Sequence, residues 1–347
     1  MAPGFNPQRR RLLKGSLLAT GAFLAAGGYL AVHKMENDTA DVVLQLGWLP
    51  GGNQIGEVVA ERLGYYLQEG LQFRIAAGGP SIDGVSVVAS GSASLGQVSS
   101  SPSIMLAVSQ DIPIQCFATC LQKHPYCFFS LKSNPVRSVS EIRNKRVGIT
   151  STAAVLLKAM LANAKIPESS VEVVPVGADM SPLLTGQVDV ISGWSTNVSA
   201  LRVLGADRVD LQLWDTGIHL YALPYYATLE TLQTHFHSVV GFLRATARGW
   251  NFARKHMDEA ANLLVKQYPA LNRNDERAAI EALMGFAFSG RAATEGWGAM
   301  DADIWKEQIA LYSQLQQFTN HIPTADQVVT MRVLDATKSD RMRMQFA

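Results

Sequence analysis

The sequence contains few cysteines. Only three occur in 347 residues, at Cys116, Cys120 and Cys127. An odd, clustered set does not form a disulfide framework. On a strand, the Cα atoms of Cys116 and Cys120 would lie about 13 Å apart, beyond the reach of a disulfide. The same spacing on a strand does not bring two thiolates to one metal ion, so we expect three buried free thiols.

The sequence also lacks an excess of charge of either sign. It has 30 Lys and Arg against 29 Asp and Glu, a net charge of +1, so no nucleic acid or strongly charged partner is predicted. Beyond the N-terminal segment, no run of about 20 residues is both free of charge and predominantly apolar, as a membrane-spanning helix requires. The length and the 48% hydrophobic residues predict two ordinary globular domains.

No catalytic constellation is recognisable. The sequence has no nucleophile elbow, no HExxH, no phosphate-binding loop and no paired-cysteine metal set. His235 and His237 fall in a predicted polar helix, where they would be solvated. Lys123 could form a Schiff base in principle, and the neighbouring His124 could reach a cleft, but no nucleophile is evident beside it. We therefore predict neither catalytic residues nor a metal or cofactor.

Residues 1–40 are predicted to be a targeting segment. Arg9-Arg10-Arg11-Leu12-Leu13-Lys14 precedes a Gly/Ala-rich apolar run over 17–32, a pattern typical of twin-arginine export. An ordinary signal or an uncleaved membrane anchor is the alternative. No cysteine follows the run, which excludes a lipoprotein anchor. The sequence thus predicts a periplasmic body, exported by the twin-arginine machinery and membrane-tethered if the signal is not cleaved.

The chain after this segment opens with a predicted strand, loop, helix, turn and strand over residues 44–73. Such a unit implies a parallel strand pair with a right-handed crossover. Ligands of open α/β sheets bind at the carboxyl ends of strands, which is where Trp48, Asn53 and Gln54 fall in this unit. The alternative is that Trp48 is a core aromatic and the loop is only a connection.

Similar strand ends recur along the chain. Exposed backbone N–H groups and hydroxyls at such turns can bind acceptor atoms of a ligand, although tight turns and helix N-caps use the same residues. The candidate ligand-binding positions of this kind are Gly79, Ser99, Ser151 and Thr152.

Two proline-containing stretches, of which the first is polar, are predicted to divide the body. Lys132–Pro135 would carry the chain out of the first lobe, and Tyr221–Tyr226 would return it. We therefore expect lobe 1 over 41–131, lobe 2 over 132–225, and C-terminal helices over 226–347 that complete lobe 1. Two lobes joined by a hinge suggest ligand capture by closure.

Several short motifs between residues 43 and 258 carry a resemblance. In chain order they are Trp48-Leu49-Pro50-x-x-Asn53, Gly64-Tyr65-Tyr66-Leu67-x-Glu69-Gly70-Leu71, Val88-Ala89-Ser90-Gly91, Leu95-Gly96, Val174-Pro175-Val176-Gly177, Gly186-Gln187-Val188-Asp189 and Thr196-Asn197. Together they resemble the periplasmic solute-binding proteins of ABC importers. The similar branch includes thiamine-pyrimidine, riboflavin, nitrate, taurine and sulfonate binders and the yeast-type thiamine pyrimidine synthase.

The resemblance implies an α/β, two-lobed type II periplasmic-binding fold with an interlobe cleft. It also implies an inner-membrane ABC permease as partner. In the pyrimidine-binding branch an aromatic side chain stacks on the ligand ring and polar loops read its edge. The positions that match are Trp48, Asn53, Gly79, Gln122 and Asn197, and Trp194 is added as a candidate because it ends the strand before Asn197.

This sequence departs from the family pattern at several points. Gln54 stands where the branch usually has His, and Val198 stands where it often has Glu. The synthase-like enzymes carry clustered cysteines where Tyr221–Tyr226 has none. These departures argue against an enzyme and weaken an amino-pyrimidine as ligand. We expect a small organic ligand, with a heterocycle such as a thiamine-type pyrimidine favoured over a sulfonate- or nitrate-like anion. A synthase-like enzyme and a sensory binding protein are the alternatives.

Overall fold

The computed structural model describes residues 39–79, 81–150, 153–177 and 179–346. The predicted export signal therefore lies outside the described residues, as do Ser151 and Thr152. Residues 41–347 form one compact unit, which is described below. None of the described helices is both long enough and apolar enough to cross a membrane.

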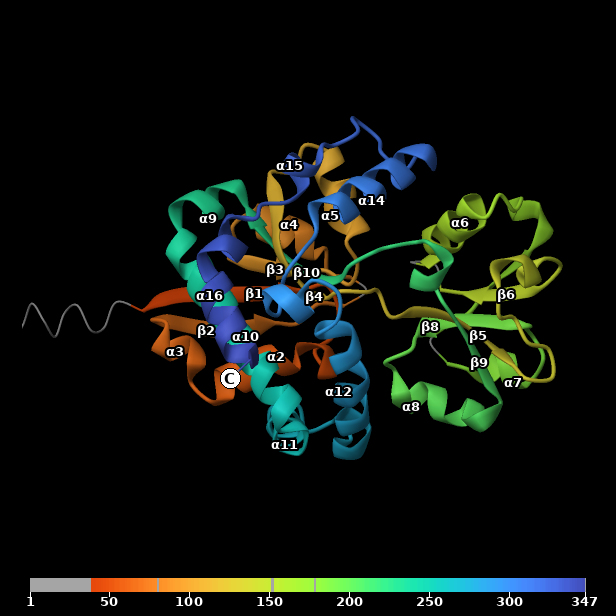
Figure 1. The fold of residues 1–347 in the computed structure, drawn as a ribbon, viewed down its shortest axis with the longest axis horizontal. Helices are drawn as coiled ribbons and strands as arrows, with labels where there is room; N and C mark the ends of the chain where they lie inside the picture. The colour runs from red at the N-terminus through yellow and green to blue at the C-terminus, as the bar shows by residue number, and fades with distance from the viewer. Residues whose placement is uncertain (1–38, 80, 151–152, 178, 347) are drawn as a thin grey trace, which may run out of the picture. The chain divides into compact units, whose positions relative to one another are not determined.

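The first lobe is built on a five-stranded sheet with the order β2-β1-β3-β10-β4 (Figure 1). Its strands are β1 (Ala40–Leu46), β2 (Leu71–Ala76), β3 (Leu95–Gln97), β4 (Ile114–Leu121) and β10 (Ala222–Thr228). β1 and β3 are parallel, whereas β10 runs antiparallel to both β3 and β4. β1, β3 and β4 therefore point the same way. The helices between these strands are α2 (Ile55–Arg62), α3 (Tyr65–Gln68), α4 (Gly84–Ala89) and α5 (Pro102–Ser109).

The predicted opening unit is confirmed element by element. After β1 the chain makes a short 3-10 turn, η1 (Gly52–Gln54), and enters α2, whose buried side includes Ile55, Val58 and Val59. Gly64 ends this helical stretch in the left-handed region, with φ of 72°, where glycine has no steric penalty. β1 and β2 lie side by side at one edge of the sheet.

The second lobe contains a five-stranded sheet with the order β7-β6-β8-β5-β9. Its strands are β5 (Tyr126–Leu131), β6 (Arg146–Ile149), β7 (Glu172–Pro175), β8 (Val190–Trp194) and β9 (Arg208–Gln212). β6 is parallel to β7 and β8, and β5 is antiparallel to β8 and β9. The lobe also holds α6 (Ala154–Asn163), α7 (Ser181–Leu184), α8 (Val198–Leu201) and the 3-10 turns η2 (Val139–Ile142), η4 (Glu168–Ser170), η5 (Arg202–Asp207) and η6 (Trp214–Thr216).

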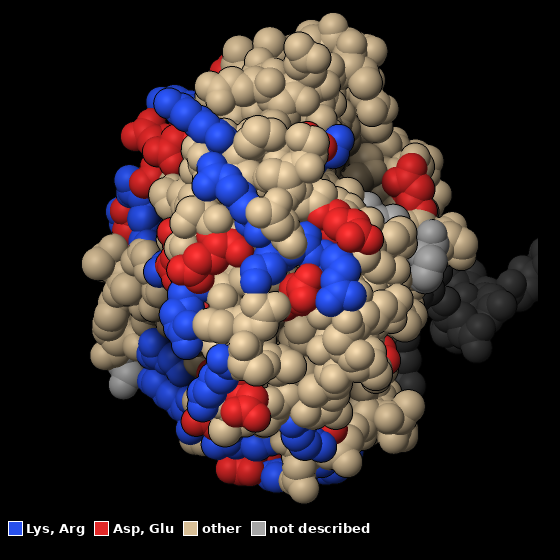
Figure 2. Space-filling model, turned by 90° about the vertical axis from the view of Figure 1, so that its right-hand side faces the viewer, with Lys and Arg blue, Asp and Glu red and all other residues tan. Residues whose placement is uncertain are grey.

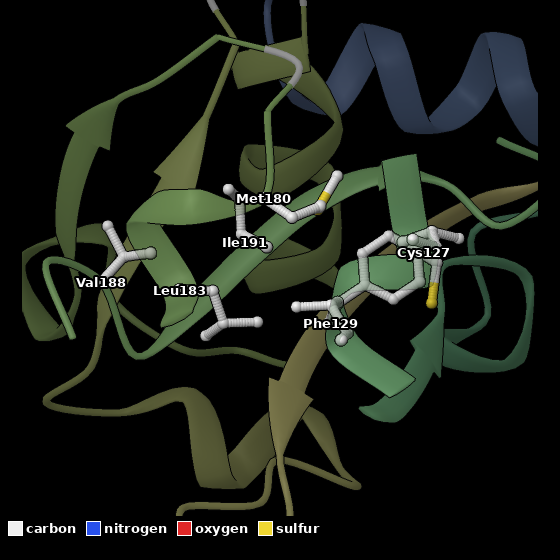
Figure 3. Close-up of a cluster of buried hydrophobic side chains, with 8 residues drawn as sticks. Cys127, Phe129, Met180, Leu183, Val188 and Ile191 are labelled. Carbon is white, nitrogen blue, oxygen red and sulfur yellow. The ribbon is translucent and has the colours of Figure 1, made fainter. Parts of the chain in front are cut away.

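Figure 3 shows the apolar core on one face of this second sheet, where strands β5 and β8 meet α7. Cys127 lies in it beside Phe129 and Ile191, all with no exposed surface. Its thiol, like those of Cys116 and Cys120, is free and buried. Burial raises the pKa of each thiol, so these thiols are unreactive core groups, as expected from their spacing.

The predicted lobe boundaries are wrong by several residues. The strand Tyr126–Leu131 pairs with β8 and β9, so the outward crossing is Gln122–Pro125 and not Lys132–Pro135. Lys132–Pro135 is instead a turn within lobe 2, closed by a hydrogen bond from the Asn134 N–H to the Leu131 carbonyl (2.9 Å). The return crossing ends before β10, which begins at Ala222 in the first sheet. A polar, proline-containing turn and a hinge have the same composition, which is why the sequence misplaced the crossing.

The C-terminal helices pack mainly on the first lobe, as predicted (Figure 1). They are α9 (Leu229–Thr234), α10 (Phe236–Lys255), α11 (Met257–Gln267), α12 (Arg273–Ala287), α13 (Ala292–Glu295), α14 (Ala302–Gln314), α15 (Ala325–Val328) and α16 (Arg332–Phe346). α10 packs most closely on α2 and α16 covers α10. α12 also contacts α8 of the second lobe, where Arg202 forms an ion pair with Asp275.

Candidate functional site

The carboxyl ends of the parallel strands define the candidate site. In the first sheet β1, β3 and β4 end together, and their following loops begin near Trp48, Ser99 and Gln122. In the second sheet β6 and β8 end together, before Thr150 and Ser195. Loops at such strand ends bind the ligands of open α/β sheets.

The outward crossing, Gln122–Pro125, brings the two sets of loops to one place. It leaves β4 at the carboxyl ends of the parallel strands of the first sheet and enters β5 beside the end of β8, where Tyr126 pairs with Trp194. The N–H of Ser195 donates to the Pro125 carbonyl (2.8 Å), and the N–H of His124 donates to Leu220 of the return crossing (2.9 Å). Both lobes are thus tied to the same short segment.

Trp48 is exposed at this edge. Its side chain is 53% accessible, which excludes the alternative of a core aromatic. The loop is fixed through its backbone, because the Gly78 N–H donates to the Trp48 carbonyl (3.0 Å). A Cβ at Gly78 would lie 2.2 Å from the Leu46 carbonyl oxygen, so only glycine permits this approach. An exposed indole held on a fixed backbone can stack on a planar ligand.

The two neighbouring candidates in this loop differ in placement. Asn53 is half-buried in η1. Gln54 is buried, and its amide donates to Gln97 Oε1 (2.8 Å) and accepts from the Gly51 N–H (3.1 Å). The structure therefore directs the Gln54 side chain into the core and not toward the strand ends. This geometry fits a residue that positions the loop.

Behind Gln54 lies a buried carboxyl group that was not among the predicted site residues. Glu57 on α2 has no exposed surface and accepts hydrogen bonds from Gln97 Nε2 (3.0 Å), Tyr225 OH (2.6 Å) and Trp250 Nε1 (3.2 Å). Burial raises its pKa to about 7, and the hydrogen bonds oppose that rise. A glutamate inside the apolar run 55–60 is the sequence signal that could have revealed it. The network connects the first loop to the centre of lobe 1.

Glu276 of α12 supports the same loop from outside. A Cβ at Gly52 would lie 2.6 Å from Glu276 Oε2, so a larger side chain at this position would have to displace the carboxylate. Burial raises the pKa of Glu276, and a hydrogen bond from the Gly52 backbone lowers it. The C-terminal helices thus help to place η1.

The remaining lobe 1 candidates divide between the edge and the interior. Ser99 is exposed. Gly79 has a φ of 155°, and among the described residues no atom lies within 4 Å of the position that a Cβ would take. Gln122 is buried, where its amide donates to the Ala299 carbonyl (2.8 Å) and accepts from the Ala292 N–H (3.3 Å). Gln122 therefore fastens the crossing to the C-terminal part of lobe 1.

Opposite Ser99 the backbone is strained. The Leu223 N–H donates to the Ser99 carbonyl (3.2 Å), and Leu223 has a φ of 54°. A bulky residue in this region is uncommon and costs conformational energy. The hydroxyl of Ser101, at the start of α5, makes no capping bond and donates to Gln308 Oε1 (2.5 Å) while it accepts from the Tyr221 N–H (3.2 Å).

In the second lobe, Trp194 and Asn197 lie at the end of β8. Trp194 is half-buried and packs edge-to-face on His124, with 5.1 Å between ring centroids. Asn197 is exposed at the start of α8, where its Oδ1 accepts from Ser199 Oγ (3.3 Å) and makes no capping bond to the backbone. The placement of Ser151 and Thr152 is outside the described residues, so their predicted role stays a prediction.

The histidines and the lysine considered as reactive groups in the sequence are not brought together in the structure. His235 and His237 are exposed, as predicted. Lys123 points to the ring of Trp214, with Nζ 5.6 Å from the centroid. Within the described ranges, no cluster of three or more His, Cys, Asp or Glu could hold a metal ion.

The surface charge is mixed. Figure 2 shows one face on which Lys and Arg are interspersed with Asp and Glu, and the upper part of that face carries few charged side chains. Two surface cavities, of about 370 and 400 Å³, are lined by residues 254–259 with Arg277 and by residues 137–139, 210–212 and 215–216. Neither includes a candidate residue at the strand ends.

Three characterised relatives are similar to this chain over most of their length. The riboflavin-binding protein RibY of Chloroflexus aurantiacus is 24% identical over 76% of this chain and 78% of its own. The formylaminopyrimidine-binding protein of Halalkalibacterium halodurans is 24% identical over 85% and 91%. The 4-amino-5-hydroxymethyl-2-methylpyrimidine phosphate synthase of Legionella pneumophila is 26% identical over 68% and 77%. The relatives thus include binding proteins and an enzyme.

The fold is that of periplasmic binding proteins. The periplasmic aliphatic sulphonate binding protein SsuA of Escherichia coli superposes with a TM-score of 0.66 at 14% identity, covering 84% of this chain and 92% of SsuA. The sequence profile of the family described as NMT1/THI5 like matches residues 52–260, which is more than half of the chain. The chain therefore belongs to the NMT1/THI5-like family.

Proposed function

We propose that this protein is the extracytoplasmic substrate-binding component of an ABC importer and captures a small organic molecule between its lobes. The observation that carries the proposal is the exposed Trp48, which follows a strand at the carboxyl edge of the first sheet, the same edge from which a crossing leads to the second sheet. The names of the binding-protein relatives support the same class of function. Closure would require that the ligand bind the closed arrangement better than the open one.

We favour a neutral planar heterocycle as the ligand. The candidate side chains at the two edges are aromatic, hydroxyl or amide groups, as in Trp48, Ser99, Trp194 and Asn197. Such a set suits ring stacking with a few directional hydrogen bonds. A sulfonate- or nitrate-like anion is the second ligand class, since backbone N–H groups and hydroxyls can also bind anions.

The remaining parts of the proposal concern location and partners. The body would act in the periplasm, after export directed by Arg9-Arg10, and would deliver its ligand to an inner-membrane permease. If the signal is not cleaved, the protein would stay tethered to the membrane. Replacing Arg9 and Arg10 by Lys should retain the precursor in the cytoplasm, whereas Arg11→Lys should not. Export of the double variant in cells that lack the twin-arginine translocase would contradict this route.

The first experiment is native mass spectrometry of the exported protein, followed by extraction and identification of any bound molecule. A stoichiometric, non-covalent heterocycle supports the proposal and identifies its class. Calorimetric titration with riboflavin, formylaminopyrimidine and taurine then measures selectivity. A covalent adduct, or a product that accumulates during incubation, would overturn the proposal in favour of a synthase-like enzyme.

A further inference from the structure

An unpaired polar atom is buried at the outward crossing. His124 is 1% exposed, and its Nε2 has no hydrogen-bond partner among the described residues. Buried polar groups are paired in nearly all native structures, so each exception needs a reason. One common reason is a partner that the protein acquires on binding.

The other ring nitrogen fixes the protonation of this histidine. His124 Nδ1 lies 3.2 Å from the backbone nitrogen of Tyr126. A backbone N–H can only donate, so Nδ1 is the acceptor and carries no proton. Burial lowers the pKa of His124 to about 3, so the ring is neutral at physiological pH. Its single proton therefore lies on Nε2, which makes Nε2 an unsatisfied donor.

The ring is held at the point where the two lobes meet. It packs edge-to-face on Trp194 at the end of β8 and on Tyr126 at the start of β5, with centroid distances of 5.1 and 6.0 Å. Its own backbone pairs with Leu220 of the return crossing. A second unpaired buried atom, Ser100 Oγ, follows β3 on the lobe 1 side, where Ser100 forms a β-bridge with Ala222. Unpaired polar atoms therefore occur on the crossing itself and on the adjoining end of a lobe 1 strand.

We propose that His124 is a specificity-determining residue that donates an Nε2–H hydrogen bond to an uncharged acceptor of the ligand. The acceptor would be a carbonyl oxygen or ring nitrogen of a planar heterocycle. The neutral Nε2–H, held between aromatic rings, can make a directional hydrogen bond but carries no positive charge to neutralise an anion. It therefore favours an uncharged acceptor over an anionic group. The inference rests on the proposed binding function and adds the chemistry by which the ligand is recognised.

The test uses formylaminopyrimidine and riboflavin as probes in calorimetric titrations of the full exported protein. His124→Phe keeps a ring but removes the donor, and His124→Asn keeps an acceptor for the Tyr126 N–H but cannot reach as far as Nε2. For a probe that binds the wild type, both variants should raise Kd by about tenfold or more, the usual effect of a lost directional contact. His219→Phe, at a half-exposed histidine of the return crossing that packs on Trp214, should bind as the wild type does.

Two results would overturn the inference. One is unchanged affinity in His124→Asn with an unchanged thermal midpoint. The other is a nitrogen-15 spectrum of the ligand-free protein that places the His124 proton on Nδ1. The spectrum needs no ligand, and a proton on Nε2 supports the inference. Failure of the wild type to bind either probe would instead count against the proposed function with this ligand class, so the two failures are distinguishable.

Discussion

Trp48 combines a large apolar side chain with more than half its surface exposed. Because little of the indole is buried, Trp48→Ala should change the free energy of unfolding by less than about 0.5 kcal/mol. Loss of a stacking surface should weaken binding of a planar ligand about tenfold, near 1.4 kcal/mol. Titration and urea unfolding of the same samples measure both. Leu49→Ala, at an equally exposed neighbour, is the control, and equal binding losses in the two variants would contradict a stacking role.

Glu57 makes the stability of lobe 1 depend on pH. Its folded-state pKa is raised from 4.5 to about 7, so the unfolded chain releases this proton first as pH rises. The free energy of unfolding should therefore fall between pH 4.5 and 7, by at most about 3 kcal/mol. Urea unfolding at several pH values should show this fall in the wild type and not in Glu57→Gln. Glu230→Gln, at an exposed position, should keep the wild-type slope, and a slope retained in Glu57→Gln would exclude Glu57 as its source.

Helices α2 and α10 approach each other at two glycines. A Cβ at Gly249 would lie 1.9 Å from the Gly56 carbonyl oxygen, so Gly249→Ala must separate the helices. Overpacking of this kind typically costs about 1–3 kcal/mol. Gly285→Ala is a matched control, because Gly285 lies in α12 and none of the described residues comes within 4 Å of the added methyl. It should stabilise by roughly 0.5–1 kcal/mol. Thermal and urea unfolding of both variants measure the difference, and a neutral Gly249→Ala would show that the contact is not tight.

At the scale of elements, local signals predicted the strands and helices well, and long-range partners decided what the sequence missed. The exposed position of Trp48 after β1 could be predicted because an aromatic in a Gly/Pro loop after a strand is a local pattern. Gln54 and Gln122 are also polar residues at strand ends, yet their partners are Gln97 and Ala299, which no spacing rule connects to them. The unpaired His124 Nε2 likewise depends on packing in three dimensions. Sheet membership of Tyr126–Leu131 required knowing which strands it pairs with.

The two lobes are also joined by an ion pair outside the candidate site. Arg202, at the start of η5 in the second lobe, pairs with Asp275 of α12, which packs on the first. The Arg202 side chain is 64% exposed, so the pair should contribute no more than about 1 kcal/mol to the arrangement of the lobes in this structure. Arg202→Ala should accordingly shift the population toward open forms and weaken ligand binding by up to about fivefold.

Small-angle scattering of the ligand-free protein measures the first effect as an increase in the radius of gyration, and titration measures the second. Arg273→Ala removes a comparable exposed pair, with Asp258, that joins only the C-terminal helices of lobe 1. It should leave both quantities unchanged. Equal effects of the two variants would mean that the ion pair of Arg202 with Asp275 contributes only to local stability. An increased radius of gyration in Arg202→Ala alone would show that this ion pair stabilises closure of the lobes around the ligand.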